Sequence, residues 1–254
     1  MDPIVPATGF IVGILIGLTG MGGGALMTPF LILVLGTRPV VAVGTDLVYG
    51  SVTKIVGAFL HWRHGTVDLP LVKRLALGSV PGGLAAVAAV RLLPESGVDA
   101  DAAVRRALGA VLIVVAATLL SRVVGIRPPR WSAQWQARLQ GRGTIVAGAV
   151  VGALVGFTSV GSGSLLVPFL VGVFSLTPAR VVGTDVFHAA ILVTVTAAGH
   201  AQGGTVNWGI VAGLLVGSIP GVALGSWLAP RMPAPALRLG IAVLLLLTGI
   251  GLLR

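Results

Sequence analysis

Two acidic side chains stand at matching places inside apolar segments, each in the triplet Gly-Thr-Asp. Asp46 follows Thr45, and Asp185 follows Thr184. A charged group at the centre of a bilayer costs about 2.5 to 3.5 kcal/mol on insertion scales, so such residues usually have a function. They could line a binding site and take up protons there. They could equally cap helices, because Thr and Asp accept hydrogen bonds from the free amides of a helix's first turn.

Two glycine-rich stretches precede these triplets, at residues 20–24 and 159–164. Each glycine costs a helix interior about 1 kcal/mol relative to alanine, so several together favour an irregular turn. The free amides at the start of the next helix carry positive partial charge and suit an oxyanion. Each glycine alone could also serve close helix packing. Because both clusters stand at matching places before Pro29 and Pro168, the pattern favours anion binding.

A lysine and three histidines are further candidates. Lys54 lies well inside an apolar segment, where it could attract an anion, pair with an intramembrane carboxylate, or extend to the membrane surface. His188 follows Asp185 by three residues, which in a helix places both on one face. His61 and His200 lie near segment ends, where we expect hydrogen bonds in turns. Four dispersed histidines without cysteine give little support for a metal site.

The predicted substrate-binding residues are thus glycines and polar residues in the breaks and in the segments that follow. They are Gly22, Gly23, Gly24, Thr45, Asp46, Lys54, Gly161, Ser162, Gly163, Ser164, Thr184, Asp185 and His188. The sequence predicts no catalytic residue, no metal ligand and no cofactor.

The elements that must position these residues are transmembrane helices. Hydrophobic residues make up 56% of the chain and charged residues 9%, against roughly 25% charged in soluble domains. A span needs about 20 apolar residues, and eight segments qualify. They are 9–35, 40–62, 69–92, 103–124, 143–174, 179–201, 206–229 and 235–253. We therefore predict an all-α, multi-pass protein of the cell inner membrane, surrounded by lipid.

The chain contains a duplication. Residues 17–82 align with 156–221 at a constant offset of 139, and 26 of the 66 aligned positions are identical. We predict two homologous transmembrane repeats of about four segments, at 1–125 and 143–254, joined by a linker at 126–142. This linker is rich in arginine, which predicts that it is cytoplasmic. The net charge of +10 is attributed to this rule and not to nucleic-acid binding.

The first segment of each repeat is interrupted by its glycine-rich stretch. Such a segment could be one long kinked span, or a hairpin of two half-helices that returns to the same side. With the linker inside, hairpins invert the second repeat and leave 11 basic residues inside and five outside, whereas long spans give nine and seven. We therefore predict an inverted repeat, an architecture in which transporters bind their substrate near the membrane midplane.

The order of these motifs resembles the sulfite exporter TauE/SafE family, also called the TSUP family. Each repeat has a Gly-rich break, then Pro-Phe-Leu, Val-Gly-Thr-Asp, His, Gly-Thr-Val and Gly-Ser-x-Pro-Gly, and the resemblance covers nearly the whole chain. It implies a permease for sulfur-containing anions such as sulfite or organosulfonates, usually described as export, with uptake suggested for some members. The exact substrate, the direction, the coupling ion and any homo-oligomer stay open.

Two other classes of function are considered. One is a non-transporting membrane subunit that serves assembly or reception. The other is an intramembrane serine hydrolase, in which Ser162 or Ser164 would act with His188 or His200. The first repeat has Gly23 and Ala25 at the places of these serines, which argues against the hydrolase.

Overall fold

The computed structural model describes residues 3–19, 23–125, 133–232 and 234–254, and this part of the chain is helical apart from short turns. The helices are α1 (Ile4–Thr19), α2 (Gly24–Leu33), α3 (Pro39–Arg63), α4 (Leu69–Leu92), η1 (Pro94–Ser96), α5 (Ala100–Val123), α6 (Ala133–Arg138), η2 (Leu139–Gly143), α7 (Thr144–Thr158), α8 (Ser162–Val173), α9 (Pro178–Gln202), α10 (Trp208–Leu228), η3 (Ala229–Arg231) and α11 (Ala234–Leu253).

The described residues include six helices that are long and apolar enough to cross a membrane. They are Pro39–Arg63, Leu69–Leu92, Ala100–Ser121, Gln136–Thr158, Pro178–Gln202 and Trp208–Leu228, with shorter apolar helices beside them. The predicted all-α, multi-pass fold is therefore confirmed. The division at the linker stays a prediction, and residues 126–132 of that linker lie outside the described residues.

Both glycine-rich stretches separate two helices. In the first repeat α1 ends before the stretch and α2 begins at Gly24; in the second, α7 ends at Thr158 and α8 begins at Ser162. Ser159 ends α7 in the left-handed conformation with φ 62°, and Gly161 has φ 130°, which side chains with a Cβ rarely adopt. The second break is thus built on a backbone that needs glycine.

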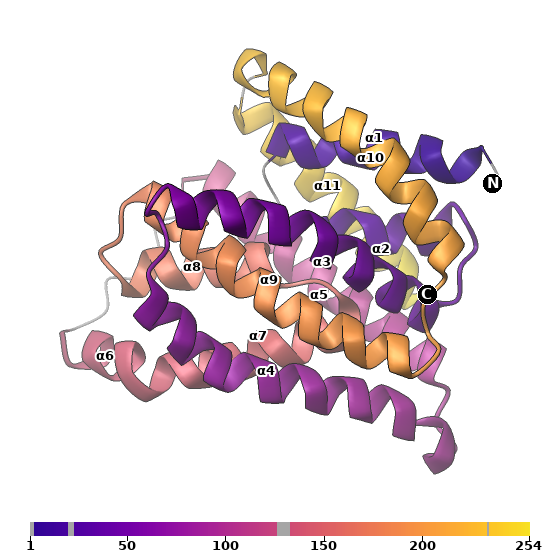
Figure 1. Ribbon diagram of the computed structural model, residues 1–254, viewed down its shortest axis with the longest axis horizontal. Coiled ribbons are helices and arrows are strands. Elements are labelled where there is room, and N and C mark those ends of the chain that lie inside the picture. Colours follow the sequence, from indigo (N-terminus) through magenta and orange to yellow (C-terminus); the bar gives the residue numbers. More distant parts are fainter. Residues whose placement is uncertain (1–2, 20–22, 126–132, 233) are drawn as a thin grey trace.

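The helix that precedes each break packs against a helix of the other repeat. α1 lies along α10, and α7 lies along α4 (Figure 1). Small residues allow close backbone approach in both pairs. In one, Gly9 and Gly13 face Leu214 and Ser218; in the other, Gly148 and Gly152 face Leu75 and Ser79, each number being 139 higher or lower. The two interfaces are therefore copies of each other.

The equivalent helices α3 and α9 cross the centre of the molecule side by side in opposite directions (Figure 1). A Cβ on Gly44, near the start of α3, would overlap the Thr205 carbonyl just beyond the end of α9, and Gly183 of α9 meets Thr66 beyond α3 in the same way. Equivalent helices that run antiparallel are what an inverted duplication requires. These contacts support that interpretation, and the orientation of the chain in the membrane stays a prediction.

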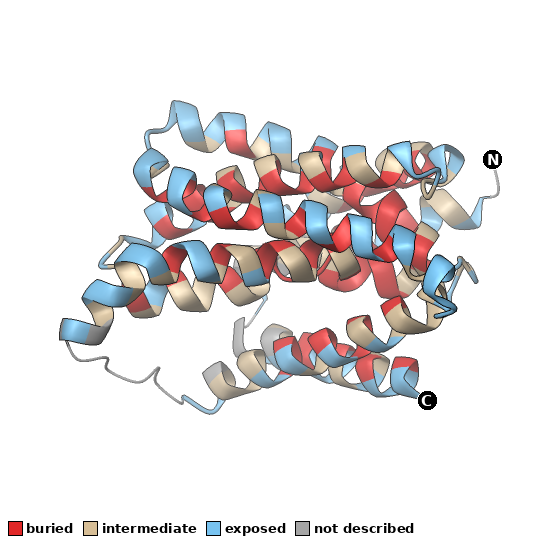
Figure 2. Cartoon of the chain, turned by 90° about the horizontal axis from the view of Figure 1, so that it is seen from below, coloured by how far each residue is buried: buried red, intermediate tan, exposed pale blue. Residues whose placement is uncertain are grey.

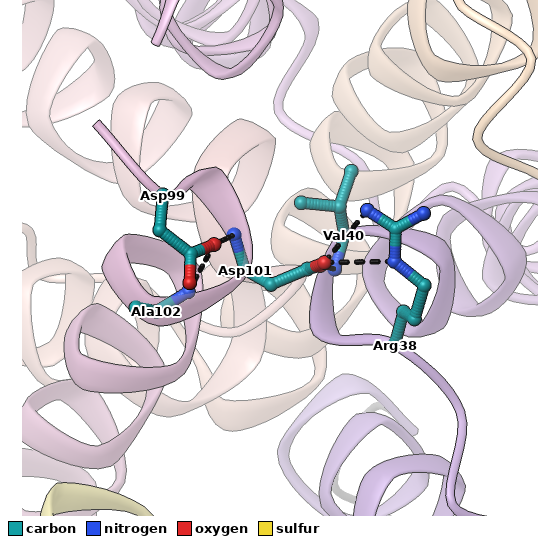
Figure 3. A network of polar contacts seen from close by, with 5 residues as sticks. All are labelled: Arg38, Val40, Asp99, Asp101 and Ala102. Carbon is teal, nitrogen blue, oxygen red and sulfur yellow. Dashed lines mark hydrogen bonds and ion pairs between the residues drawn. The ribbon is translucent and has the colours of Figure 1, made fainter. Parts of the chain in front are cut away.

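One end of α3 is tied to the start of α5 (Figure 3). The Asp101 carboxylate accepts hydrogen bonds from Arg38 Nε at 2.8 Å and from the Val40 amide at 3.0 Å. Asp99 accepts from the amides of Asp101 and Ala102, which caps the start of α5. Two free helix N-termini are thereby satisfied together.

Buried residues concentrate where the helices face one another, while exposed residues cover the outer faces (Figure 2). Many exposed side chains are large and apolar, including Leu77, Val216 and Leu247. In water such a surface would aggregate, whereas helices in a bilayer expose apolar side chains to lipid tails. The burial pattern is therefore typical of a membrane bundle.

Candidate functional site

The two helix breaks meet at one small cavity. It has a volume of about 10 Å³ and is lined by Gly24, Ala25, Ser159, Gly161, Ser162, Gly163 and Ser164. The N-termini of α2 and α8, one from each repeat, therefore share a cavity. A Cβ on Gly24 would overlap the carbonyl oxygen of Ser159, so glycine is needed for this approach. The volume suits about one water molecule, so the cavity is closed to larger solutes in this conformation.

Asp46 connects the first repeat to the break of the second. Its carboxylate is buried, and Oδ2 accepts hydrogen bonds from Thr28 Oγ1 at 2.5 Å and from Ser159 Oγ at 2.8 Å. Thr28 belongs to α2, and Ser159 is the left-handed residue that ends α7. Asp46 thus holds the α7–α8 break against α2 instead of capping its own helix.

Asp185, the counterpart of Asp46, lacks these partners. It is buried, and no hydroxyl of the described residues donates to its carboxylate, whereas Oδ1 is unpaired in both aspartates and Asp46 has its two donors at Oδ2. The position equivalent to Thr28 is Val167, which has no hydroxyl to donate. A buried carboxylate without donors requires compensation from a cation or a proton. The two acidic residues are therefore equivalent in sequence but not in environment.

Lys54 supplies a positive charge beside the breaks. Its Nζ donates a hydrogen bond to Ser162 Oγ at 2.7 Å, and Ser162 is the first residue of α8. The ammonium also acts electrostatically on Asp46 and Asp185. The side chain therefore points toward the small cavity, not toward the membrane surface.

The Gly-Ser-x-Pro-Gly motifs contribute a buried serine to each half. His188 is fully buried, and its Nε2 is 2.7 Å from Ser79 Oγ, which joins α9 to α4. Its counterpart Tyr49 on α3 has a polar interaction with Ser218 on α10. Nδ1 of His188 has no partner within the described residues. Near the middle of both helix pairs, a polar contact therefore holds the two helices together.

A second cavity of about 650 Å³ opens between α1, α3, α9 and α10. Its lining residues are Ile16, Gly17, Gly23, Tyr49, Val52, Thr53, Lys54, Val56, Gly57, His61, Val186, Leu215, Ser218, Ile219, Val222 and Ser226. Along α3 it extends from Tyr49 past Lys54 to His61. That end of the molecule also carries the linker, because Arg74 near the start of α4 donates to the Gln140 carbonyl. The large cavity therefore leads from the linker side to Lys54.

The equivalent region of the second repeat is packed shut. There α9 lies against α4, and a Cβ on Gly83 would be 2.7 Å from Thr196 Cγ2. His200 Nε2 donates a hydrogen bond to the Gly156 carbonyl oxygen at 2.9 Å. Arg91 donates to the Gly199 carbonyl near the same end. Among the described residues, the large cavity thus approaches the breaks from the linker side, and the equivalent region of the second repeat is closed.

Comparison with known proteins identifies the family. The model of the sulfite exporter TauE/SafE family matches residues 5–252. The chain belongs to this family. It is 42% identical over 248 residues to the "Probable membrane transporter protein YjnA" of Bacillus subtilis (strain 168), which covers 96% of this chain and 97% of the relative. It is 30% identical over 236 residues to a "Probable membrane transporter protein" of Xylella fastidiosa (strain Temecula1 / ATCC 700964), covering 89% and 84%. No solved structure matches.

Membership of the TauE/SafE family, together with the names of these relatives, supports a membrane transporter. The predicted family is confirmed. The candidate spans and the bacterial relatives fit a multi-pass protein of the inner membrane.

In this TauE/SafE chain the predicted site residues fall into three groups. Those at or beside the small cavity are Gly24, Lys54, Gly161, Ser162, Gly163 and Ser164, with Asp46 one hydrogen bond away through Ser159. Gly23 lines the large cavity, and Asp185 and His188 lie within electrostatic reach of Lys54. Gly22 lies outside the described residues.

Thr45 and Thr184 form the third group and face the opposite repeat. Thr45 Oγ1 accepts from the Asn207 amide, and Thr184 Oγ1 accepts from the Asp68 amide, both at 3.0 Å. Asn207 is the N-cap of α10, and Asp68 is the N-cap of α4, so each threonine contacts the start of a helix from the other repeat. The threonines thus fix the ends of α3 and α9 to each other.

Sequence reasoning missed Thr28, Ser159 and Ser79 as partners of the predicted residues. Ser79 lies in a motif shared by both repeats, which is a usable signal. Thr28 has Val167 as its counterpart and is not a repeated polar position, and Ser159 lies in the predicted break at 159–164 but its contact with Asp46 was not predicted. Asymmetry between repeats would have been the signal for these two.

The serine–histidine pairs considered from the sequence are not formed. His188 contacts Ser79, and His200 contacts Gly156, while Ser162 contacts Lys54. Among the described residues, no group of three or more His, Cys, Asp or Glu is placed to hold a metal ion.

Proposed function

We propose that the protein is a secondary permease that exports a small sulfur-containing anion, such as sulfite or an organosulfonate, from a site between the two helix breaks. The observation that carries this proposal is the convergence of the α2 and α8 N-termini, from opposite repeats, on one cavity beside Lys54. The family's description as sulfite exporters supports the class of substrate.

The chemistry of this cavity fits an oxyanion. Each helix N-terminus presents free amides with a partial positive charge of about half an elementary charge. The serines at the start of α8 add hydroxyl donors, and the Lys54 ammonium adds a full charge. Sulfite and sulfonate groups carry three oxygens on sulfur, which can accept from donors that approach from several directions. The two termini and Lys54 supply such an arrangement.

Access to this site is proposed to alternate. The large cavity reaches Lys54 from the linker side, while the equivalent region at the opposite side is packed shut. With the linker in the cytoplasm, an anion would enter from the cytoplasm, meet Lys54 and displace its contact with Ser162. Opening of the opposite side would then release it, which corresponds to export.

Flux into proteoliposomes tests this proposal. Purified protein should carry sulfite, or one of a set of organosulfonates and thiosulfate, faster than protein-free vesicles. The same anions should raise its melting temperature, because ligands that bind the folded state stabilise it. A folded protein that carries and binds none of these anions would overturn the proposal.

One contact favours a different class. A lysine at 2.7 Å from a serine hydroxyl is an arrangement that can activate a serine nucleophile, as Lys54 and Ser162 show here. Stoichiometric labelling of Ser162 by a fluorophosphonate probe would support a hydrolase. The permease predicts no such labelling.

A further inference from the structure

His61 and His200 occupy equivalent positions near the ends of α3 and α9, and their Nδ1 atoms make equivalent contacts. Nδ1 of His61 is 2.9 Å from Thr66 Oγ1, and Nδ1 of His200 is 2.9 Å from Thr205 Oγ1. These contacts fix each ring to the turn that follows its helix. They leave the other ring nitrogen, Nε2, outside these turn contacts.

The Nε2 contacts differ between the two histidines. His200 is 2% exposed and donates to the Gly156 carbonyl at 2.9 Å. Gly156 lies in the last turn of α7, where helix carbonyls lack an amide partner and remain free to accept. Its counterpart in the last turn of α1 is Gly17, and both Gly17 and His61 line the 650 Å³ cavity. One histidine is therefore engaged while the other faces open space.

The difference lies in the position of α3 and α9, not in the helices they face. The α1–α10 and α7–α4 interfaces repeat each other residue for residue, as Gly13 with Ser218 and Gly152 with Ser79 show. Each pair can therefore be treated as one rigid body. After His188, α9 packs closely against the α7–α4 pair. After Tyr49, α3 is separated from the α1–α10 pair by the 650 Å³ cavity. The polar contacts of those two residues mark the level at which the packing begins to differ.

We propose that His61 and His200 are alternating gate residues, each of which closes one side of the transport path by binding the free carbonyl of a broken helix. In the present conformation His200 holds Gly156. In the opposite conformation, His200 releases Gly156, and His61 Nε2 donates to the Gly17 carbonyl. Both histidines are positioning residues, because they act on helix positions and not on the substrate. The inference rests on the proposed function only in requiring two access states.

The acceptors connect the gates to the binding site. Gly156 stands three residues before Ser159, which contacts Asp46, and Gly17 precedes the first break in the same way. A histidine that donates to either carbonyl therefore contacts the last turn of a helix that ends at the site, and can shift the position of that helix. A purely local role in the turn would need only the threonine contact, which both histidines already have.

The absence of cysteine from the chain allows a direct test by thiol labelling. Thr53→Cys places a reporter in the open cavity, and Leu192→Cys places one at the equivalent, fully buried position of the closed side. Each reporter is combined with His200→Ala or His61→Ala in vesicles of known orientation. A membrane-impermeant maleimide is then applied from each side without substrate.

His200→Ala should raise labelling of Leu192→Cys about fivefold and lower that of Thr53→Cys, because one hydrogen bond favouring the present state is lost. His61→Ala should shift both reporters in the opposite direction. His200→Gln, which keeps an amide donor, should restore part of the wild-type pattern. The proposal is overturned if both alanine variants shift the reporters in the same direction, or if neither shifts them. A failure of sulfite flux would leave these labelling results unaffected, so the two proposals fail separately.

Discussion

The α3–α10 pair and the α9–α4 pair are equivalent, each with one helix from each repeat. Only α9 and α4 pack together along their whole length. The closed pair buries His200 and Thr196, whereas the counterparts His61 and Gly57 line a cavity of about 650 Å³. The interfaces that carry these pairs, α1–α10 and α7–α4, are the same. The comparison shows that similar sequences here support two packings, which is the property that alternation requires.

Charge distinguishes the repeats in a second way. Lys54 has Val193 as its counterpart, and the donors to Asp46 have no counterparts that serve Asp185. The backbone is therefore nearly symmetric, while the side chains at the site are not. The similar backbones of the two repeats allow the proposed movement. The different side chains place the positive charge of Lys54 in one repeat only.

The largest expected effect comes from removing the Lys54 charge. Lys54→Gln should lower sulfite flux at least about thirtyfold, since a buried cation that meets an anion contributes about 2 to 5 kcal/mol. Val193→Gln, at the equivalent position, should lower flux much less. Initial rates in proteoliposomes measure both. Equal losses of flux would show that a glutamine at this depth is itself disruptive and that loss of the Lys54 charge is not the cause.

Next in size are the two glycines that bring α3 and α9 to the opposite loops. Gly44→Ala and Gly183→Ala should each lower stability by about 1 to 3 kcal/mol, because the added methyl would overlap Thr205 or Thr66. Thermal unfolding in detergent should show similar decreases for the two. Gly251→Ala is the control, since a Cβ there meets open space. A large difference between the paired variants would contradict the equivalence of the two contacts.

The acidic pair should respond unequally. Asp46→Asn weakens the charge-assisted hydrogen bonds from Thr28 and Ser159, so we expect a loss of about 1 to 3 kcal/mol. Within the described residues Oδ1 is unpaired in both aspartates, so the difference lies at Oδ2: Asp185→Asn removes a buried charge that lacks the Thr and Ser donors of Asp46, and stability should be unchanged or higher. Melting temperatures of both variants provide the measurement. The reverse order would show that Asp185 is the better-compensated carboxylate.

The smallest effect is expected at the surface. Arg38 forms an ion pair with Asp101 at 2.8 Å, but its side chain is 76% exposed. Arg38→Ala should therefore change stability by no more than about 1 kcal/mol. Asp101→Asn should cost more, because that carboxylate also accepts from the Val40 amide at the start of α3. A larger loss for the arginine than for the aspartate would contradict this ranking.

Much of the fold could be predicted from the sequence, because its signals are local. Apolar length predicted the spans, and the glycine clusters predicted where the first segment of each repeat is interrupted. The contact between Asp46 and Ser159 could not be predicted in this way, since the two residues are 113 positions apart and only tertiary packing joins them. The direction of the Lys54 side chain likewise depends on Ser162, from the other repeat.

The pairing of α1 with α10 and of α4 with α7 means that neither half can bury its own interface. A single half made alone would leave small-residue faces on two helices uncovered, and another copy in the reverse orientation would cover both. Each half of the chain therefore depends on the other to cover these faces. Separate halves produced together should reassemble, while either half produced alone should form antiparallel pairs or be degraded.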